Sequence, residues 1–171
     1  MKNHFLFVTL AFVSIIGLEV RAQGNSISTI DIPSIEVQKN GEKIFLRRVD
    51  HCLALMEETA QKIGVKGVAV MVYLPGEETV SGVSKMKVVG EMTRKNLNFL
   101  AVANSKIAEM ADTHKDSGSK LREPLIGETG WRGGLIEKVG TGYIMAAFSG
   151  GTEDEDIIVS KAGIEGILKF Y

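Results

Sequence analysis

The spacing of hydrophobic residues predicts helices and strands from residue 44 onward. Over residues 44–63 apolar side chains recur every three or four positions, which is typical of a helix with one buried face. Gly64 follows and is placed to end this helix. The expected buried face consists of Phe45, Val49, Cys52, Leu53, Met56, Ala60 and Ile63.

The next two segments have the pattern of β-strands. Residues 67–73 form a short valine-rich run between Gly64 and a Leu-Pro-Gly turn, which predicts a buried strand. Residues 80–92 place Val83, Met86, Val88 and Val89 among polar residues. This second segment is therefore expected to pair antiparallel with the first.

The helical period returns over residues 97–114, where Leu100, Ala103, Ile107 and His114 share one face. Residues 119–128 contain Pro124 and Gly127 but no pattern, and are expected to form a loop.

The C-terminal third predicts a hairpin and a last helix. Residues 133–136 and 140–149 should pair around a turn at 138–140. Thr152 followed by Glu155 fits a capping box at a helix start. Because most connections are too short for parallel crossovers, an α+β domain with an antiparallel sheet covered by helices is expected.

The N-terminus predicts export. Residues 5–18 are apolar but fall short of the ~18 residues that a membrane span needs. With Val20-Arg21-Ala22 as cleavage site, residues 1–22 are expected to be a signal peptide, a retained anchor being the alternative. Residues 23–43 are polar and suggest a loose extension with at most an edge strand at 28–32. One domain, residues 44–171, would then be secreted or periplasmic.

Composition excludes several function classes. A net charge of -1 without a basic stripe argues against nucleic acid or an acidic membrane surface as a partner. Cys52 is the only cysteine, so the chain cannot form an internal disulfide. The mature chain has only His51 and His114, which lack metal-ligand spacing, and it contains no Walker, Rossmann or nucleophile-elbow motif.

Residues 140–167, GTGYIMAAFSGGTEDEDIIVSKAGIEGI, combine a glycine-rich strand, Ser-Gly-Gly, acidic residues and an Ala-Gly helix. This order resembles the closing signature of the GlcG/HbpS-like family, also called the haem-degrading domain family. The strand VAVMV at residues 68–72 and the helix that carries Lys106 are also similar to the family. The resemblance extends from residue 44 to the C-terminus.

The resemblance implies a profilin-like antiparallel sheet of about five strands flanked by helices. It also implies a small-ligand-binding domain, with haem or a related tetrapyrrole as ligand and a homo-oligomer as the assembly. Two alternatives stay open: a haem-degrading enzyme, and a non-catalytic oligomeric accessory module.

His114 is the candidate iron ligand, in a pocket between the sheet and the helix that it closes. The alternative is a histidine that interacts with the helix dipole and packs at the edge of the core. His51 is expected to be exposed, and Cys52 to be a small buried apolar residue. Trp131 is expected to be either a pocket wall or a loop anchor.

The segment Ser149, Gly150 and Gly151 lies between a buried strand and a helix start, so its backbone N–H groups are candidates to hold a ligand carboxylate. The acidic run at residues 153–156 would oppose an anion and attract a cation, or simply face the helix dipole. By resemblance, Lys106 would bind a ligand carboxylate; the alternative is a solvated charge.

Overall fold

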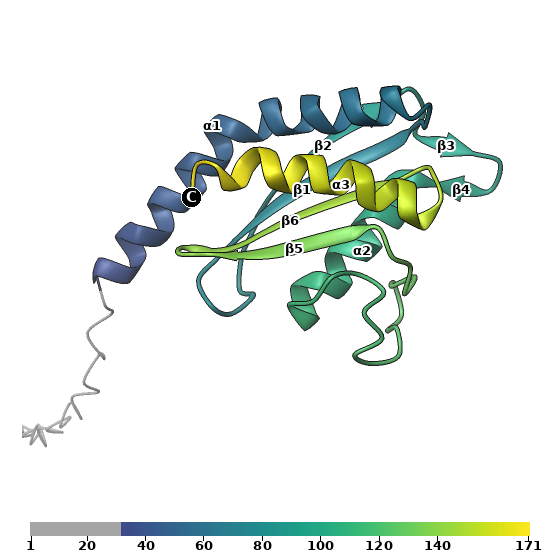
Figure 1. Cartoon of the computed structure of the whole chain (residues 1–171). Helices are drawn as coiled ribbons and strands as arrows, with labels where there is room; N and C mark the ends of the chain where they lie inside the picture. The colour runs from purple at the N-terminus through teal and green to yellow at the C-terminus, as the bar shows by residue number, and fades with distance from the viewer. Residues whose placement is uncertain (1–31) are drawn as a thin grey trace, which may run out of the picture. The chain divides into compact units, whose positions relative to one another are not determined.

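The computed structural model describes residues 32–171, with side chains from residue 40 onward. The predicted signal peptide and residues 23–31 of the predicted extension lie outside the described residues. The elements, in chain order, are α1 (Ile32–Lys62), β1 (Gly67–Pro75), β2 (Val83–Val89), β3 (Thr93–Arg94), β4 (Leu97–Asn98), α2 (Phe99–Thr113), β5 (Gly134–Val139), β6 (Gly142–Ser149) and α3 (Glu153–Leu168) (Figure 1).

The main sheet has four antiparallel strands in the order β2-β1-β6-β5. The two central strands, β1 and β6, are buried along almost their whole length, which is why both read as nearly continuous apolar runs. The predicted α+β class is confirmed. The described residues contain this four-stranded sheet and a separate two-stranded one, β3-β4, which is roughly consistent with the expected number of about five strands.

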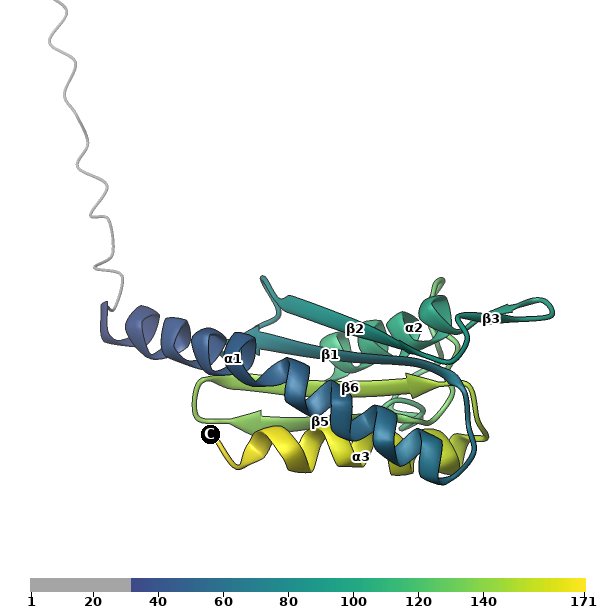
Figure 2. The same cartoon turned by 90° about the horizontal axis from the view of Figure 1, so that it is seen from above.

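Helices cover both faces of the main sheet because successive side chains of a strand point to opposite sides. Ala69, Met71 and Tyr73 belong to the core cluster with α1 and α3, whereas Val68, Val70 and Val72 belong to the cluster with α2. Figures 1 and 2 show α1 and α3 on one face and α2 on the other. The result is a helix-sheet-helix arrangement of three layers.

The boundary of the predicted extension at residue 43 is wrong, because α1 begins at Ile32. Pro33 stands in its first turn, where proline is tolerated. Gly41 is buried, and a Cβ there would lie 2.3 Å from the Tyr73 hydroxyl oxygen. This crowding favours glycine at position 41. Tyr171 also donates a hydrogen bond to the Gly41 carbonyl at 2.5 Å, which ties this part of α1 to the C-terminus.

The predicted hairpin and helix ends are confirmed with small shifts. β5 and β6 pair from Gly134 with Ala147 to Val139 with Gly142, so the turn falls at residues 140–141. Thr152 and Glu155 form the expected capping box at the start of α3. The Asn98 side chain accepts a hydrogen bond from the Ala101 N–H and caps α2.

Candidate functional site

His114 lies at the end of α2 as its C-cap, with a left-handed backbone φ of 50°. Its ring stacks on Tyr143 at a centroid distance of 4.3 Å, and Nε2 lies 3.2 Å from the Thr79 hydroxyl. The open pocket beside it, of about 530 Å³, is also lined by the acids Glu77, Glu78 and Asp112. Such a rim disfavours the propionates of a haem.

The prediction of a ligand pocket between α2 and the sheet is wrong. Apolar side chains from the helix and the strands fill that space and form one core cluster. Its buried members include Val70, Val72, Phe99, Ala103, Met110 and Met145. His114 therefore faces the surface at the edge of this cluster, as its alternative interpretation had it.

Lys106 is buried, with 1% of its surface exposed, so the solvated-charge alternative is wrong. Its Nζ lies 2.7 Å from Asp156 Oδ2 and donates to the Phe148 carbonyl at 2.8 Å. Burial lowers the pKa of Lys106 and raises the pKa of Asp156, while the attraction between the two charges opposes both shifts. This ammonium is thus already paired with a carboxylate of the chain.

The same carboxylate occupies the predicted anion site. The Gly151 N–H donates to Asp156 Oδ1 at 3.0 Å, and the Gly150 N–H also bonds to this carboxyl group. Ser149, the last residue of β6, is buried. The backbone donors expected to hold a ligand carboxylate therefore hold an internal one, which comes from the first turn of α3.

The predicted residues do not form one site. Tyr143, the partner of His114, stands near the start of β6, whereas Gly150 follows its last residue. At ~3.3 Å per residue, the two ends of β6 are about 20 Å apart. A single small ligand does not contact His114 and Gly150 together.

A different pocket opens on the outer side of Gly150 and Gly151. It has a volume of about 460 Å³ and is lined by Arg94, Lys95, Asn96, Leu97, Phe99, Gly150 and Gly151. The β3-β4 hairpin supplies its wall and extends from the same end of the sheet as the last residue of β6 (Figure 2). A neighbouring pocket of about 360 Å³ shares Arg94, Gly150 and Gly151.

Arg94 fastens the hairpin to the sheet. Its guanidinium donates to the Gly150 carbonyl at 3.2 Å, pairs with Glu91 and lies 5.0 Å from the centre of the Phe99 ring. Lys95 and Asn96, at the turn, are exposed, and neither side chain has a hydrogen bond or ion pair with another described residue. Both remain available to a ligand.

Sequence reasoning missed this pocket because β3 and β4 have two residues each, too few for any period to be visible. The only local signal for this hairpin is its turn. A Lys-Asn pair in the middle of a short polar segment, TRKNLN, is typical of a turn.

The loop between α2 and β5 is held by a second polar cluster. Arg122 bonds to both oxygens of Glu128 at 2.7 and 2.8 Å and to Asp112. These bonds, with the Leu125 N–H, lower the pKa of Glu128 to about 2.

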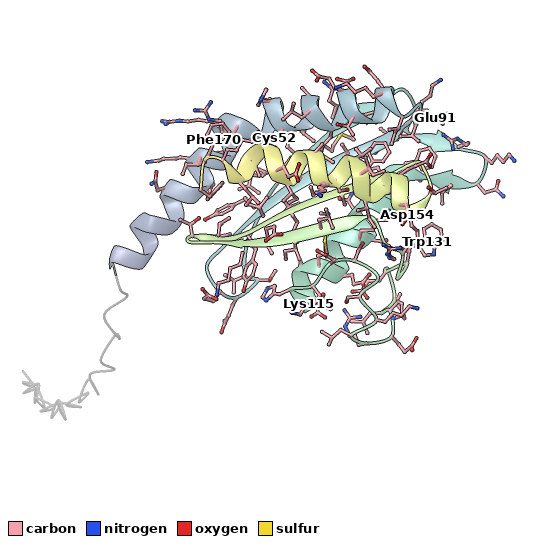
Figure 3. All side chains as sticks on the ribbon, in the orientation of Figure 1. Cys52, Glu91, Lys115, Trp131, Asp154 and Phe170 are labelled. Atoms are coloured by element: carbon pink, nitrogen blue, oxygen red, sulfur yellow. The ribbon has the colours of Figure 1, made fainter. Side chains whose placement is uncertain are left out.

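Trp131 lies on the same loop, below the first turn of α3, where Asp154 also lies (Figure 3). Its side chain is 45% exposed, which argues against a loop anchor as well as against a pocket wall.

We expect this loop to loosen in acid. A folded pKa below the ordinary 4.5 means that the stabilisation is present above pH 4.5 and is lost as the pH falls toward 2. Trp131 is the only tryptophan, so its fluorescence reports on the loop directly. The transition should lie between pH 4.5 and 2, and in Arg122→Gln it should move up toward pH 4.5. Identical pH profiles of fluorescence for the wild-type protein and Arg122→Gln would show that the Arg122–Glu128 contact does not hold the loop.

His51 is exposed and Cys52 is buried, as predicted. Burial raises the pKa of the Cys52 thiol, which keeps it protonated near neutral pH. Among residues 40–171, no group of three or more His, Cys, Asp or Glu side chains is arranged to hold a metal ion. No helix among the described residues is long and apolar enough to span a bilayer.

Comparison of the chain with family models, with curated proteins and with solved structures finds no match. Function is therefore inferred from the geometry described above and from the resemblance in residues 140–167.

Proposed function

We propose that this chain is an exported domain that binds a small carboxylate-bearing ligand in the 460 Å³ pocket beside Gly150 and Gly151. The GlcG/HbpS-like resemblance supports haem or a related tetrapyrrole as the ligand class, and a profilin-like classification of the fold. The observation that carries the proposal is the pairing, in one pocket, of an available cation with apolar surface.

Each part of the pocket matches one part of such a ligand. The Lys95 ammonium and the Asn96 amide are donors for a propionate. Leu97, which is 37% exposed, offers apolar contact to a macrocycle, and Phe99, which is almost fully buried, lies beneath it in the lining. The volume lies within the ~300–1,000 Å³ typical of small-molecule sites. Because the pocket is open, the ligand would stay partly exposed to solvent.

Iron ligation is a separate question, because His114 lies near the opposite end of β6. Metal-free protoporphyrin IX keeps the propionates of haem but offers no iron to a histidine. Binding of both compounds supports recognition through carboxylate and ring. Binding of haemin alone, weakened in His114→Ala, would instead place the ligand beside His114.

The test is an absorbance titration of the mature chain from Gln23 with haemin and with protoporphyrin IX. We expect a saturable shift of the Soret band for both. In Lys95→Glu the affinity should fall about tenfold, since an attraction worth up to ~1 kcal/mol is replaced by repulsion. Lys115→Glu is the matched control, because Lys115 is also an exposed lysine, at the end of α2, and lines neither pocket beside Gly150.

Two outcomes would redirect the proposal. Loss of the bound haem spectrum on addition of reductant and oxygen would favour the haem-degrading alternative. Absence of a spectral shift with either compound would contradict tetrapyrrole binding, and the oligomeric accessory module would take its place.

A further inference from the structure

A fourth pocket lies under the loop between α2 and β5 and shares no lining residue with the 460 Å³ pocket beside Gly150. Its volume is about 250 Å³, and Glu109, Gly118, Lys120, Arg122 and Thr129 are among its walls. The volume is below the ~300 Å³ at which drug-sized sites begin. Only a small molecule fits here.

Glu109 supplies the feature that points to a ligand. The residue is 6% exposed, so its carboxylate is almost fully removed from solvent. Its Oε1 accepts a hydrogen bond from the Gly118 N–H at 2.9 Å, whereas Oε2 is buried with no donor within hydrogen-bonding distance among the described residues. A buried acceptor without a donor costs ~1–3 kcal/mol, and more when it is charged. A bound donor would remove this cost.

The charges around the pocket select the kind of donor. Arg122 is already bonded to Asp112 and Glu128, and Glu123 is a further acid in the wall. Lys120 is the other base there, and it is exposed. The lining thus holds two acids, Glu109 and Glu123, and two bases. Two further acids outside the lining, Asp112 and Glu128, already neutralise Arg122, and this balance favours a cation over an anion. Thr129, whose hydroxyl lies 3.0 Å from that of Ser105, adds a neutral polar group.

We infer that this pocket binds a small primary ammonium compound, whose N–H groups donate to the Glu109 carboxylate. Charge-assisted hydrogen bonds of this kind are about twice as strong as neutral ones. The ligand donates a hydrogen bond to Glu109 Oε2 and leaves the hydrogen bond from the Gly118 N–H to Oε1 in place. This site is independent of the tetrapyrrole pocket, so either one can fail without the other.

The test follows the backbone amide NMR signals of Gly118 and Gly130 in the full mature chain at fixed ionic strength. n-Propylammonium is the probe, and 1-propanol and propionate are its neutral and anionic counterparts. We expect saturable shifts at both glycines with n-propylammonium, affinity at least tenfold lower for 1-propanol, and no saturation with propionate. Equal affinity for 1-propanol, or shifts at neither glycine, would overturn the inference.

Two variants distinguish direct binding to the Glu109 carboxylate from a general effect of the charges around the pocket. Glu109→Gln preserves the shape and an acceptor for Gly118 but removes the charge, and should weaken binding of n-propylammonium at least tenfold. Lys120→Gln removes a nearby positive charge and should leave the affinity equal or raise it. Unchanged affinity in Glu109→Gln, or weakened binding in Lys120→Gln, would show that Glu109 is not the binding group. The second variant keeps the test decisive if the first does not fold.

Discussion

Replacing Asp156 by alanine should lower the free energy of unfolding by about 3–5 kcal/mol, the usual cost of removing one partner from a buried ion pair. The loss would strand the Lys106 ammonium, which is 1% exposed, without its carboxylate. It would also remove the acceptor of the Gly150 and Gly151 N–H groups. Urea unfolding followed by circular dichroism measures the effect.

The control for this prediction is a pair on the surface of α3. Lys161 and Glu165 are 3.7 Å apart and more than 60% exposed, so Glu165→Ala should change stability by less than about 0.5 kcal/mol. The double variant Lys106→Met with Asp156→Leu should recover part of the loss, because no charge is then left buried without a partner. If Asp156→Ala costs no more than Glu165→Ala, the buried Lys106–Asp156 pair does not contribute the expected stability.

Replacing Gly150 by alanine should cost more than about 2 kcal/mol, because strain and crowding act together. The backbone φ of Gly150 is 154°, which side-chain-bearing residues rarely adopt. A Cβ would also lie 2.0 Å from the Lys66 carbonyl oxygen, and a backbone atom cannot turn away as a flexible side chain can. Thermal unfolding of the variant measures the loss.

Two other glycines separate these causes. Gly64 has a positive φ of 76° but nothing within 4 Å of its Cβ position, so Gly64→Ala should cost about 1 kcal/mol from strain alone. Gly140 has neither constraint, and Gly140→Ala should be neutral within about 0.5 kcal/mol. If Gly150→Ala lowers the stability no more than Gly64→Ala does, the backbone at Gly150 is not in close contact with the Lys66 carbonyl.

Both substitutions bear on function through the same turn. Gly150 and Gly151 form the floor of the proposed tetrapyrrole pocket, and their N–H groups bond to Asp156. The Lys106–Asp156 pair thus positions the turn from inside the protein, while Lys95 remains free to meet a ligand from outside. Lys106, which the resemblance implies as a ligand-binding residue, thus supports the proposed pocket from inside the protein.

The sequence by itself determined the elements whose signals are local. A repeat of three or four predicted the buried face of α1, and its members from Phe45 to Ala60 are all buried. The last predicted member, Ile63, follows the end of the helix and is 37% exposed. Thr152 and Glu155 form the predicted capping box because both partners lie within one helical turn. The α+β class followed from the order of these elements and from the short connections between them.

Tertiary structure alone decided which charges meet. Asp156 is one of four acids in the first turn of α3, and only packing shows that it is the one buried against Lys106, fifty residues away. In the same way, β6 separates His114 from Gly150, and Arg94 joins a short hairpin to Gly150 across the end of the sheet. Such contacts depend on how the layers pack, and periodicity along the chain carries no information about contacts between distant residues.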